Sequence, residues 1–306
     1  MKNTENLITV RHLQKTYGKV RAVEDISFEV HDGEIFGIIG PNGAGKTTTV
    51  ECLIGLRDAD GGEVRVLGMD PRRQAREIRQ RIGVQLQQAS LPEDMKVWEA
   101  LDLFSAFYSH TLNWRNLLEE WGLSEKRNSR FASLSGGQKQ RLFIALSLVN
   151  DPELVFLDEL TTGLDPQARR NTWDLIRKMQ REGKTILLVT HFMEEAETLC
   201  DRVAIIDQGR LIALDTPQNL IRQVDGKTCL RFTLPHRMDV TWLSALPEVS
   251  SFQQNDLEVV MTGDSTLLVV AASSLAERGI LPSDFRTERT TLEDVFLALT
   301  GRKIRE

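Results

Sequence analysis

The sequence predicts an α/β protein with a second, smaller domain, and three observations support this fold class. Short apolar runs typical of buried strands alternate with segments of helical periodicity along most of the chain. A glycine-rich loop at residues 40–47 stands between one of these strands and the helix that follows it. The length of 306 residues exceeds that of a typical domain, so we expect two domains.

The composition is ordinary for a soluble globular protein, with 41% hydrophobic and 27% charged residues. The net charge of −6 argues against a nucleic-acid-binding protein, which more often has a basic excess. Cys52, Cys200 and Cys229 are widely spaced, which predicts buried thiols in a reducing compartment rather than disulfides or zinc ligands. No apolar run approaches the ~18 residues that a membrane span needs. Residues 1–6 lack the core of a signal peptide.

The loop from Gly40 to Thr47 has the spacing G-x-x-x-x-G-K-[ST]. It follows a strand-like run at residues 34–39 and precedes a helix predicted over residues 48–56, which is the context that this motif requires. Glycines let successive backbone N–H groups point at phosphate oxygens, and the helix adds its positive end. Lys46 is expected to reach the β- and γ-phosphates, and the Thr47 hydroxyl to ligate Mg²⁺. The sequence therefore predicts a nucleoside triphosphate site.

Two carboxylates, Asp158 and Glu159, follow the apolar run 154–157, which is typical of a central parallel strand. The carboxyl ends of such strands are where α/β sheets bind ligands. Adjacent strand residues point to opposite faces, so the two acids need not share a role. Asp158 suits a Mg²⁺ ligand, and Glu159 suits a base or orienter for attacking water. His191 ends the next buried strand, at residues 185–190, where we expect it to contact the γ-phosphate.

The sequence predicts a second helix N-terminus that suits anion binding. The segment Leu-Ser-Gly-Gly-Gln at residues 134–138 opens a helix predicted to end at Val149. A hydroxyl, unhindered backbone N–H groups and the helix dipole together favour a phosphate. Because the chain already has a phosphate loop, this second site raises the question of whose phosphate it holds.

Tyr17 lies in the turn between two strand-like segments, residues 7–12 and 20–30. It is either an aromatic residue of that turn or a side chain that stacks on a nucleobase. Its position in the sequence leaves both interpretations open.

A helical insert interrupts the alternating pattern between residues 88 and 130. Its apolar residues recur at i, i+3, i+4, i+7, i+10 and i+11 and form one stripe. We expect this stripe mainly to pack inside the insert, and its exposed remainder to be a docking surface. The stripe consists of Val97, Ala100, Leu101, Phe104, Phe107 and Tyr108.

With these motifs in this order, the chain resembles an ATP-binding cassette (ABC) protein over residues 7–224. The resemblance implies a P-loop NTPase cassette: a mixed sheet core, an antiparallel β subdomain and a helical subdomain at about residues 88–150. It implies a nucleotide-binding domain at residues 1–224 and a small C-terminal accessory domain at residues 225–306.

The resemblance also implies roles for single residues. Tyr17 matches the adenine-stacking aromatic, Gln87 the Q-loop glutamine and Asp165 the D-loop aspartate. Glu159 matches the catalytic glutamate and His191 the switch histidine. The implied catalytic residues are Glu159, His191, Gln87 and Lys46; the ATP-binding residues are Tyr17, Asn42, Gly43, Gly45, Lys46, Thr47, Thr48, Ser135, Gly137, Gln138 and Asp165; the Mg²⁺ ligands are Thr47, Gln87 and Asp158.

One position departs from the family pattern. The family usually has proline after the catalytic glutamate, and here Leu160 stands at that position. A proline would bias Glu159 towards an extended backbone. The absence of this proline affects how firmly the backbone orients the Glu159 carboxylate.

The resemblance answers the question of the second phosphate site. Two cassettes of the family face head to tail, so that Ser135 and Gly137 of one complete the pocket at Lys46 of the other. ATP then bridges the protomers and hydrolysis removes the bridge, which is a two-state element biased by a ligand. Because this chain has one set of motifs, the resemblance implies a homodimer.

The segment from residue 226 to the end has the element order βαββαβ, which suggests a small ferredoxin-like α+β domain. We expect its last helix to start with a capping box, Thr290-x-x-Glu293, and to stop at Gly301. Residues 291–301 are similar to the tails of bacterial ABC-2-type exporter ATPases, which include a drug-resistance group. Dimer or permease contact is the expected role of this domain.

These features favour an ATPase subunit of a membrane exporter, driven by ATP and Mg²⁺. It is expected to work under a separate multi-span ABC-2-type permease, which the helical insert contacts. The expected location is the cytoplasm, peripheral on the inner face of the cell membrane, with no nucleic-acid partner. The alternative is a soluble ABC switch acting on ribosomes or nucleic acid, which typically carries two cassettes or long coiled-coil insertions. A P-loop kinase is disfavoured by the helix start at residues 134–138.

Overall fold

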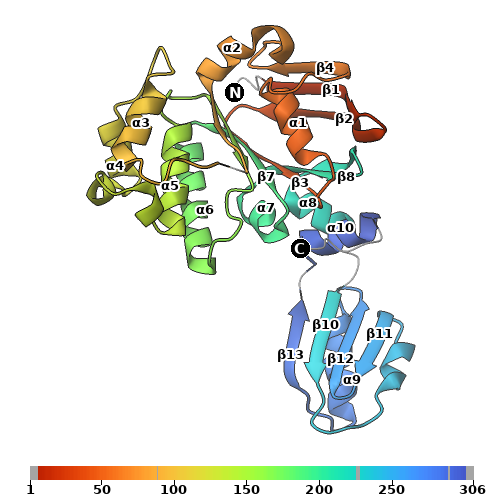
Figure 1. Cartoon of the computed structure of the whole chain (residues 1–306). Helices are drawn as coiled ribbons and strands as arrows, with labels where there is room; N and C mark the ends of the chain where they lie inside the picture. Colours follow the sequence, from red (N-terminus) through yellow and green to blue (C-terminus); the bar gives the residue numbers. More distant parts are fainter. Residues whose placement is uncertain (1–5, 88, 225–227, 289, 301–306) are drawn as a thin grey trace. The chain divides into compact units, whose positions relative to one another are not determined.

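The computed structural model describes residues 6–87, 89–224, 228–288 and 290–300 (Figure 1). These residues divide into two compact units: those up to Pro217 form the first, and those from Gln218 onward form the second. Helix α8 (Pro217–Val224) is thus grouped with the second unit. The predicted functional boundary after residue 224 stays a prediction.

Within the described residues, the frame of the first unit is a nine-stranded mixed sheet with the order β4-β1-β2-β9-β8-β3-β7-β6-β5. Its middle part is parallel, whereas β1, β2 and β4 pair in antiparallel fashion. The predicted mixed sheet with an antiparallel β subdomain is therefore confirmed. The strands are β1 (Asn6–Tyr17), β2 (Val20–His31), β3 (Ile35–Ile39), β4 (Gly61–Val66), β5 (Ile82–Gln85), β6 (Leu154–Asp158), β7 (Thr185–Thr190), β8 (Arg202–Asp207) and β9 (Arg210–Asp215).

The register of the central strands decides where the functional residues lie. Strands β3, β6 and β7 are buried along their whole length, because neighbouring strands and helices enclose them. Ile39 of β3 pairs with Thr190 of β7, and Asp158 of β6 pairs with Val189. The three strands therefore end at the same edge of the sheet.

The helices of the first unit include a helical insert, as predicted. In α3, Val97, Ala100 and Leu101 are fully buried, which agrees with internal packing of the stripe. The helix ends at Ser105, and Phe107 beyond it is 64% exposed. The Gln80 side chain donates to the Phe107 carbonyl, which gives that carbonyl a partner outside the helix. The helices are α1 (Lys46–Leu53), α2 (Pro71–Arg81), α3 (Val97–Ser105), α4 (Trp114–Glu120), α5 (Gly136–Ser147), α6 (Pro166–Arg181) and α7 (Met193–Leu199), with 3-10 segments at Ser124–Lys126 and Phe131–Ser133.

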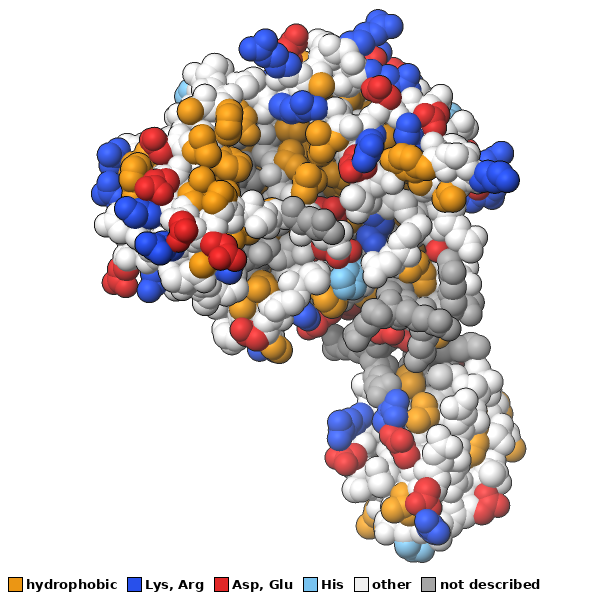
Figure 2. Space-filling model, viewed as in Figure 1, with side chains coloured by type: hydrophobic (Ala, Val, Ile, Leu, Met, Phe, Trp, Pro, Cys, Tyr) orange, Lys and Arg blue, Asp and Glu red, His pale blue; other side chains and the backbone are white. Residues whose placement is uncertain are grey.

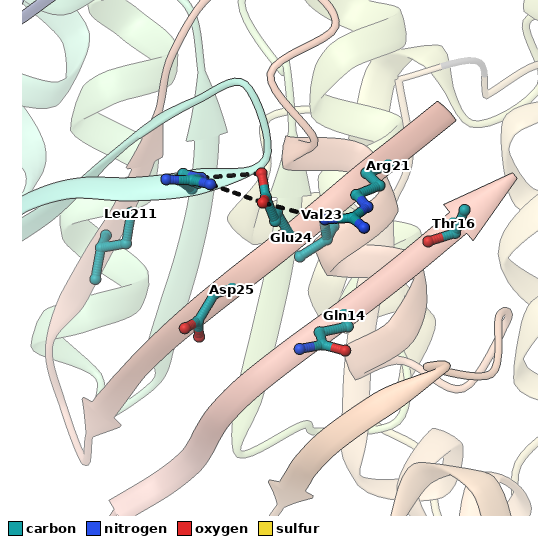
Figure 3. Close-up of a pocket in the computed structure, with 8 residues that line it drawn as sticks. Gln14, Thr16, Arg21, Val23, Glu24, Asp25 and Leu211 are labelled. Atoms are coloured by element: carbon teal, nitrogen blue, oxygen red, sulfur yellow. Dashed lines mark hydrogen bonds and ion pairs between the residues drawn. The ribbon is translucent and has the colours of Figure 1, made fainter. Parts of the chain in front are cut away.

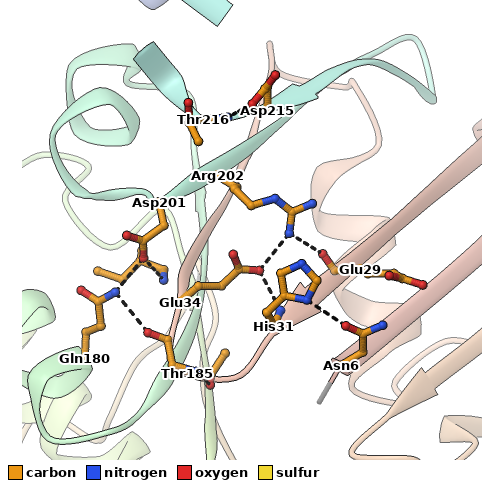
Figure 4. A network of polar contacts seen from close by, with 12 residues as sticks. Asn6, Glu29, His31, Glu34, Gln180, Thr185, Asp201, Arg202, Asp215 and Thr216 are labelled. Atoms are coloured by element: carbon orange, nitrogen blue, oxygen red, sulfur yellow. Dashed lines mark hydrogen bonds and ion pairs between the residues drawn. The ribbon is translucent and has the colours of Figure 1, made fainter. Parts of the chain in front are cut away.

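A network of polar contacts fixes the amino end of β3, opposite the edge where the strands end (Figure 4). The Glu34 carboxylate accepts hydrogen bonds from the His31 N–H at 2.7 Å and from Arg202 at 3.2 Å. Asp201 accepts a hydrogen bond from Gln180 at 2.6 Å. Burial raises the pKa of Glu34, and Arg202 opposes that rise. The network holds β2, β8 and α6 around the first residue of the central strand.

The second unit is a small α+β domain with an antiparallel sheet in the order β11-β12-β10-β13. This order and these strand directions match a ferredoxin-like sheet. A 3-10 segment, Thr241–Ala245, stands where the sequence predicts the first helix. The hydrophobic core of the second unit includes Leu230, Phe232, Met261 and Leu267. The remaining elements are β10 (Thr228–Thr233), β11 (Val249–Asn255), β12 (Glu258–Gly263), α9 (Leu267–Glu277), β13 (Ser283–Glu288) and α10 (Leu292–Thr300).

The capping box predicted for the last helix is wrong by one residue. Helix α10 begins at Leu292, so Thr291 rather than Thr290 is its N-cap. The Asp294 carboxylate accepts the Thr291 N–H at 2.8 Å, and the Asp294 N–H donates to the Thr291 hydroxyl at 3.4 Å. The predicted stop at Gly301 lies outside the described residues. Among the helices that the structure describes, none has the length and hydropathy that crossing a bilayer requires.

Candidate active site

The phosphate loop joins β3 to α1 in a conformation that requires glycine. Gly45 has φ +101°, and a Cβ there would lie 2.3 Å from the Ala22 carbonyl oxygen. The Lys46 ammonium donates to the carbonyls of Gly40 at 2.8 Å and Pro41 at 3.1 Å, and so spans the loop. Burial lowers the pKa of Lys46, against the attraction of the nearby acids. The loop therefore presents a desolvated cation beside its backbone N–H groups.

Asp158 lies behind the phosphate loop and has almost no exposed surface. The Thr47 hydroxyl donates to Asp158 Oδ2 at 3.5 Å, whereas Oδ1 has no hydrogen-bond partner among the described residues. Burial and the neighbouring Glu159 raise the pKa of Asp158 to about 6. A buried carboxylate oxygen without a partner, next to a hydroxyl, is a donor set that fits Mg²⁺.

The four predicted catalytic residues meet at the Glu159 carboxylate. Gln87 Nε2 donates to Glu159 Oε2 at 2.7 Å. His191 Nδ1 lies 3.2 Å from Oε1, a close polar contact without hydrogen-bond geometry, and Lys46 Nζ lies 4.0 Å from the same oxygen. These residues come from four separate segments of the chain, which the sheet edge brings together.

The backbone at Glu159 is left-handed, with φ +50°. Such a conformation costs a non-glycine residue about 1–3 kcal/mol and persists only where its surroundings fix it. Three hydrogen bonds do so: the Glu159 N–H donates to Val189 at 2.9 Å, the Thr162 N–H donates to Glu159 at 3.3 Å, and Gln140 donates to the Leu160 carbonyl. With Leu160 in place of the family's proline, Glu159 thus has a left-handed rather than an extended backbone.

A pocket of about 520 Å³ opens over the phosphate loop. This volume is within the range of small-molecule sites. Tyr17 lines the pocket and is 40% exposed, and the Lys15 ammonium and the Arg57 guanidinium lie 5.5 and 6.0 Å from the centre of its ring. The lining residues are Tyr17, Val20, Arg21, Ala22, Asn42, Gly43, Gly45, Lys46, Thr47, Thr48, Gln87, Glu159 and Gln208.

The sequence missed four of these lining residues: Val20, Arg21, Ala22 and Gln208. The first three follow the turn after Tyr17, which pairs with Val20 across that turn. Gln208 reaches the pocket because the neighbouring Gly209 N–H donates to the Ala44 carbonyl at 2.9 Å. The sequence predicts the hairpin of β8 and β9, but it does not show that the turn of this hairpin contacts the phosphate loop. The hairpin and the loop are more than 150 residues apart in the chain.

The other predicted ATP-binding residues lie outside this pocket. Ser135 and Gln138 form a capping box at the start of α5: Ser135 accepts the Gln138 N–H at 3.4 Å, and Gln138 accepts the Ser135 N–H at 3.0 Å. Asp165 caps α6 by accepting the Ala168 N–H at 2.8 Å. A Cβ at Gly137 would lie 3.8 Å from the Ala168 side chain, so the two helix starts adjoin. Both Ser135 and Asp165 are exposed to solvent.

A second, larger hollow of about 710 Å³ lies between β1, β2 and β9 (Figure 3). Arg210 makes two hydrogen bonds to Glu24 across it, at 2.7 and 2.9 Å. None of the predicted site residues lines this hollow. We therefore interpret this hollow as a structural contact in which the Glu24–Arg210 pair joins β2 to β9. We assign nucleotide binding to the pocket over the phosphate loop.

The fold and the pocket define a P-loop nucleotide hydrolase, and the N-terminus of α5 at Ser135 is exposed outside the pocket. The ABC transporter family model matches residues 23–162. Nod factor export ATP-binding protein I of Burkholderia orbicola is 39% identical over 307 residues, with 98% of each chain covered. Daunorubicin resistance ATP-binding protein DrrA2 of Streptomyces coeruleorubidus is 36% identical over 302 residues, with 95% of this chain and 94% of the relative covered.

Solved structures show the same architecture. The ATP binding subunit of an ABC transporter has a TM-score of 0.64 and 30% identity, covering 71% of this chain and 93% of that one. A bacterial ABC transporter cassette solved as a dimer has a TM-score of 0.60 and 26% identity, covering 68% and 98%. The chain belongs to the ABC transporter family, and it is an ABC-type ATPase.

Replacing Gly45 by alanine is expected to weaken ATP binding at least tenfold, because the new methyl group collides with a backbone oxygen that cannot move aside. Titration with a fluorescent ATP analogue measures the affinity. Gly18→Ala is the matched control: Gly18 also has a positive φ, +58°, but a Cβ there meets nothing within 4 Å. Equal affinities of the two variants would contradict the geometry of the loop.

The raised pKa of Asp158 predicts a pH-dependent cost to stability. The folded state keeps the proton that the unfolded state loses between about pH 4 and pH 6, so the free energy of unfolding falls as pH rises through this window. Asp158→Asn removes this contribution. Its stability relative to the parent chain should rise by up to about 3 kcal/mol across the window. Urea denaturation without Mg²⁺ at several pH values measures the difference, and a constant difference would show that Asp158 is not desolvated.

Proposed function

We propose that this chain is the ATP-hydrolysing subunit of a membrane exporter, that it works as a homodimer, and that a separate multi-span permease carries the cargo. The single observation that carries the proposal is the exposed N-terminus of α5 at Ser135, which lies outside its own chain's pocket. Relatives named for Nod factor export and daunorubicin resistance support the exporter class.

Within one chain, the residues at the sheet edge have separate roles in binding and hydrolysing ATP. Tyr17 stacks on the base, and the loop N–H groups with Lys46 hold the phosphates. Glu159 takes a proton from the attacking water, and the Gln87 amide holds its carboxylate in place by a hydrogen bond. His191 contacts the γ-phosphate.

Thr47, Asp158 and Gln87 would hold Mg²⁺, which supplies positive charge against the β- and γ-phosphates. The unpartnered Oδ1 of Asp158 supports this assignment. Ionised Asp158 has the charge that a divalent cation stabilises, so cation binding and loss of the Asp158 proton go together.

A second copy of the chain completes the site. Ser135, Gly137 and Gln138 of that copy approach the γ-phosphate held at Lys46, and its Asp165 lies beside them. ATP then holds the two copies together, and hydrolysis releases them. The relative solved as a dimer supports an assembly of this kind.

The contact with the permease is assigned to the helical insert, and with it a position at the inner face of the membrane. Hydrophobic side chains gather over the helical part of the first unit (Figure 2). Leu103 is 44% exposed and Phe107 is 64% exposed. The Gln87 segment leads into this insert, so a movement of the insert reaches the Glu159 carboxylate through the Gln87 hydrogen bond. The second unit is assigned a further contact with the dimer or the permease.

Glu159→Gln should bind ATP, hydrolyse it at least a hundredfold more slowly, and form a dimer in ATP but not in ADP, because the proton acceptor is lost while the phosphate contacts remain. Size-exclusion chromatography with light scattering measures the mass. Glu153→Gln is the control, since Glu153 is an exposed carboxylate paired with Arg81. A monomer at saturating ATP would rule out the head-to-tail dimer.

Replacing Leu103 and Phe107 together by serine should reduce recovery of a multi-span protein on the tagged chain from detergent-solubilised membranes, and leave the ATPase rate of the isolated chain unchanged. Ile212→Ser, at a hydrophobic side chain that is 39% exposed on β9, is the matched control. Recovery of ribosomes or DNA with the unaltered chain, in place of a multi-span protein, would favour the soluble ABC switch and overturn the exporter proposal.

A further inference from the structure

Glu195 of α7 is a fully buried carboxylate that the proposed reaction does not use. Its Oε1 accepts a hydrogen bond from the Trp173 indole N–H of α6 at 2.9 Å, and its Oε2 has no hydrogen-bond partner among the described residues. A carboxylate without access to water is costly to bury, so its position requires an explanation. Three segments of the chain surround this carboxylate, and their identity suggests its role.

Three segments of the active site meet around the Glu195 carboxylate. The Thr190 hydroxyl, directly before His191, lies beside it, and so does the Thr161 hydroxyl, in the turn that follows Glu159. Both hydroxyls act against burial, which raises the pKa of Glu195. The carboxylate thus lies beside the turn that carries the base and the strand end that carries the switch histidine.

Helix α6 contributes the third segment through one of its faces. Asp165, Arg169 and Trp173 follow one another at four-residue spacing, so they lie along one side of the helix. Asp165 caps the helix, the Arg169 guanidinium lies 4.4 Å from the centre of the Phe192 ring, and Trp173 holds Glu195.

The Phe192 ring in turn contacts the His191 ring, with their centres 4.1 Å apart. Helix α6 therefore contacts the segment after β7 at two points: Arg169 contacts the Phe192 ring, and Trp173 donates to the Glu195 carboxylate. Helices α6 and α7 are direct neighbours (Figure 1).

We propose that Glu195 is a positioning residue: through Trp173 it locks the His191 segment to helix α6, so that a displacement of the Asp165 turn moves His191 relative to Glu159. This inference rests on the proposed function, because Asp165 is displaced only where a second copy of the chain closes against it. In that closed state, Glu195 transmits the arrival of the second copy to the group at the γ-phosphate.

Trp173→Phe tests the link, since it removes the indole N–H and keeps an aromatic ring in the core. We expect kcat for ATP to fall about tenfold and KM to change less than twofold, as for an interaction needed only in the transition state. Trp121→Phe is the matched control: Trp121 is also buried, the centre of its ring lies 5.9 Å from the Lys178 ammonium of α6, and its indole N–H has no partner among the described residues. Equal kcat values for the two variants would overturn the proposal.

Substitutions of Glu195 separate positioning from packing. Glu195→Leu removes the acceptor and should lower kcat as far as Trp173→Phe does. Glu195→Gln keeps an oxygen that accepts the indole N–H and should restore kcat to within about twofold of the parent chain. Equal rates in the glutamine and leucine variants would contradict the hydrogen-bond link.

The Trp173 indole ¹⁵N–¹H resonance, assigned with Trp173→Phe, reports the link directly. In the Glu159→Gln background we expect ATP to shift this resonance and ADP to leave it in place. Identical resonances in ATP and ADP would overturn the proposal. If the parent chain neither hydrolyses ATP nor dimerises, the proposed function fails and this inference with it; if it does both, and Trp173→Phe matches Trp121→Phe, this inference alone fails.

Discussion

The parallel pairing of β3, β6 and β7 is the constraint on which the rest of the structure depends. Ile39 pairs with Thr190 and Asp158 pairs with Val189, so the phosphate loop, the two acids and His191 leave the sheet at one edge. A shift of one residue in this register would turn each side chain to the opposite face. The complete burial of the three strands specifies the register, because each strand must match a covering layer on both faces.

At that edge the structure concentrates charge in a place with little water. Lys46, Asp158 and Glu159 are all nearly buried, and burial lowers the pKa of Lys46 and raises that of Asp158. Such groups interact strongly with a charged ligand because the surrounding dielectric is low. The Gln87 side chain, from a distant segment, holds the Glu159 carboxylate by a hydrogen bond. An arrangement of this kind suits phosphoryl transfer, in which catalysis consists mainly of positioning and electrostatics.

The second feature that shapes the function is the pair of adjoining helix starts at Ser135 and Asp165. Each is capped by its own chain, and each remains exposed. The first places a positive helix end outside its own chain's pocket. In the proposed dimer the site is divided between two chains, so that ATP binding is coupled to assembly.

The sequence alone determined the phosphate loop, the strand that carries Asp158, the helix that opens at residues 134–138 and the ferredoxin-like strand order, because local spacing and periodicity encode each of these. The register of the last capping box was wrong by one residue, since two threonines and two acids offered competing frames. Only the tertiary structure decided the left-handed backbone of Glu159, the approach of Gln208 and the burial of Glu195 against Trp173. These depend on contacts between residues far apart in the chain, where side-chain packing rather than local preference fixes the geometry.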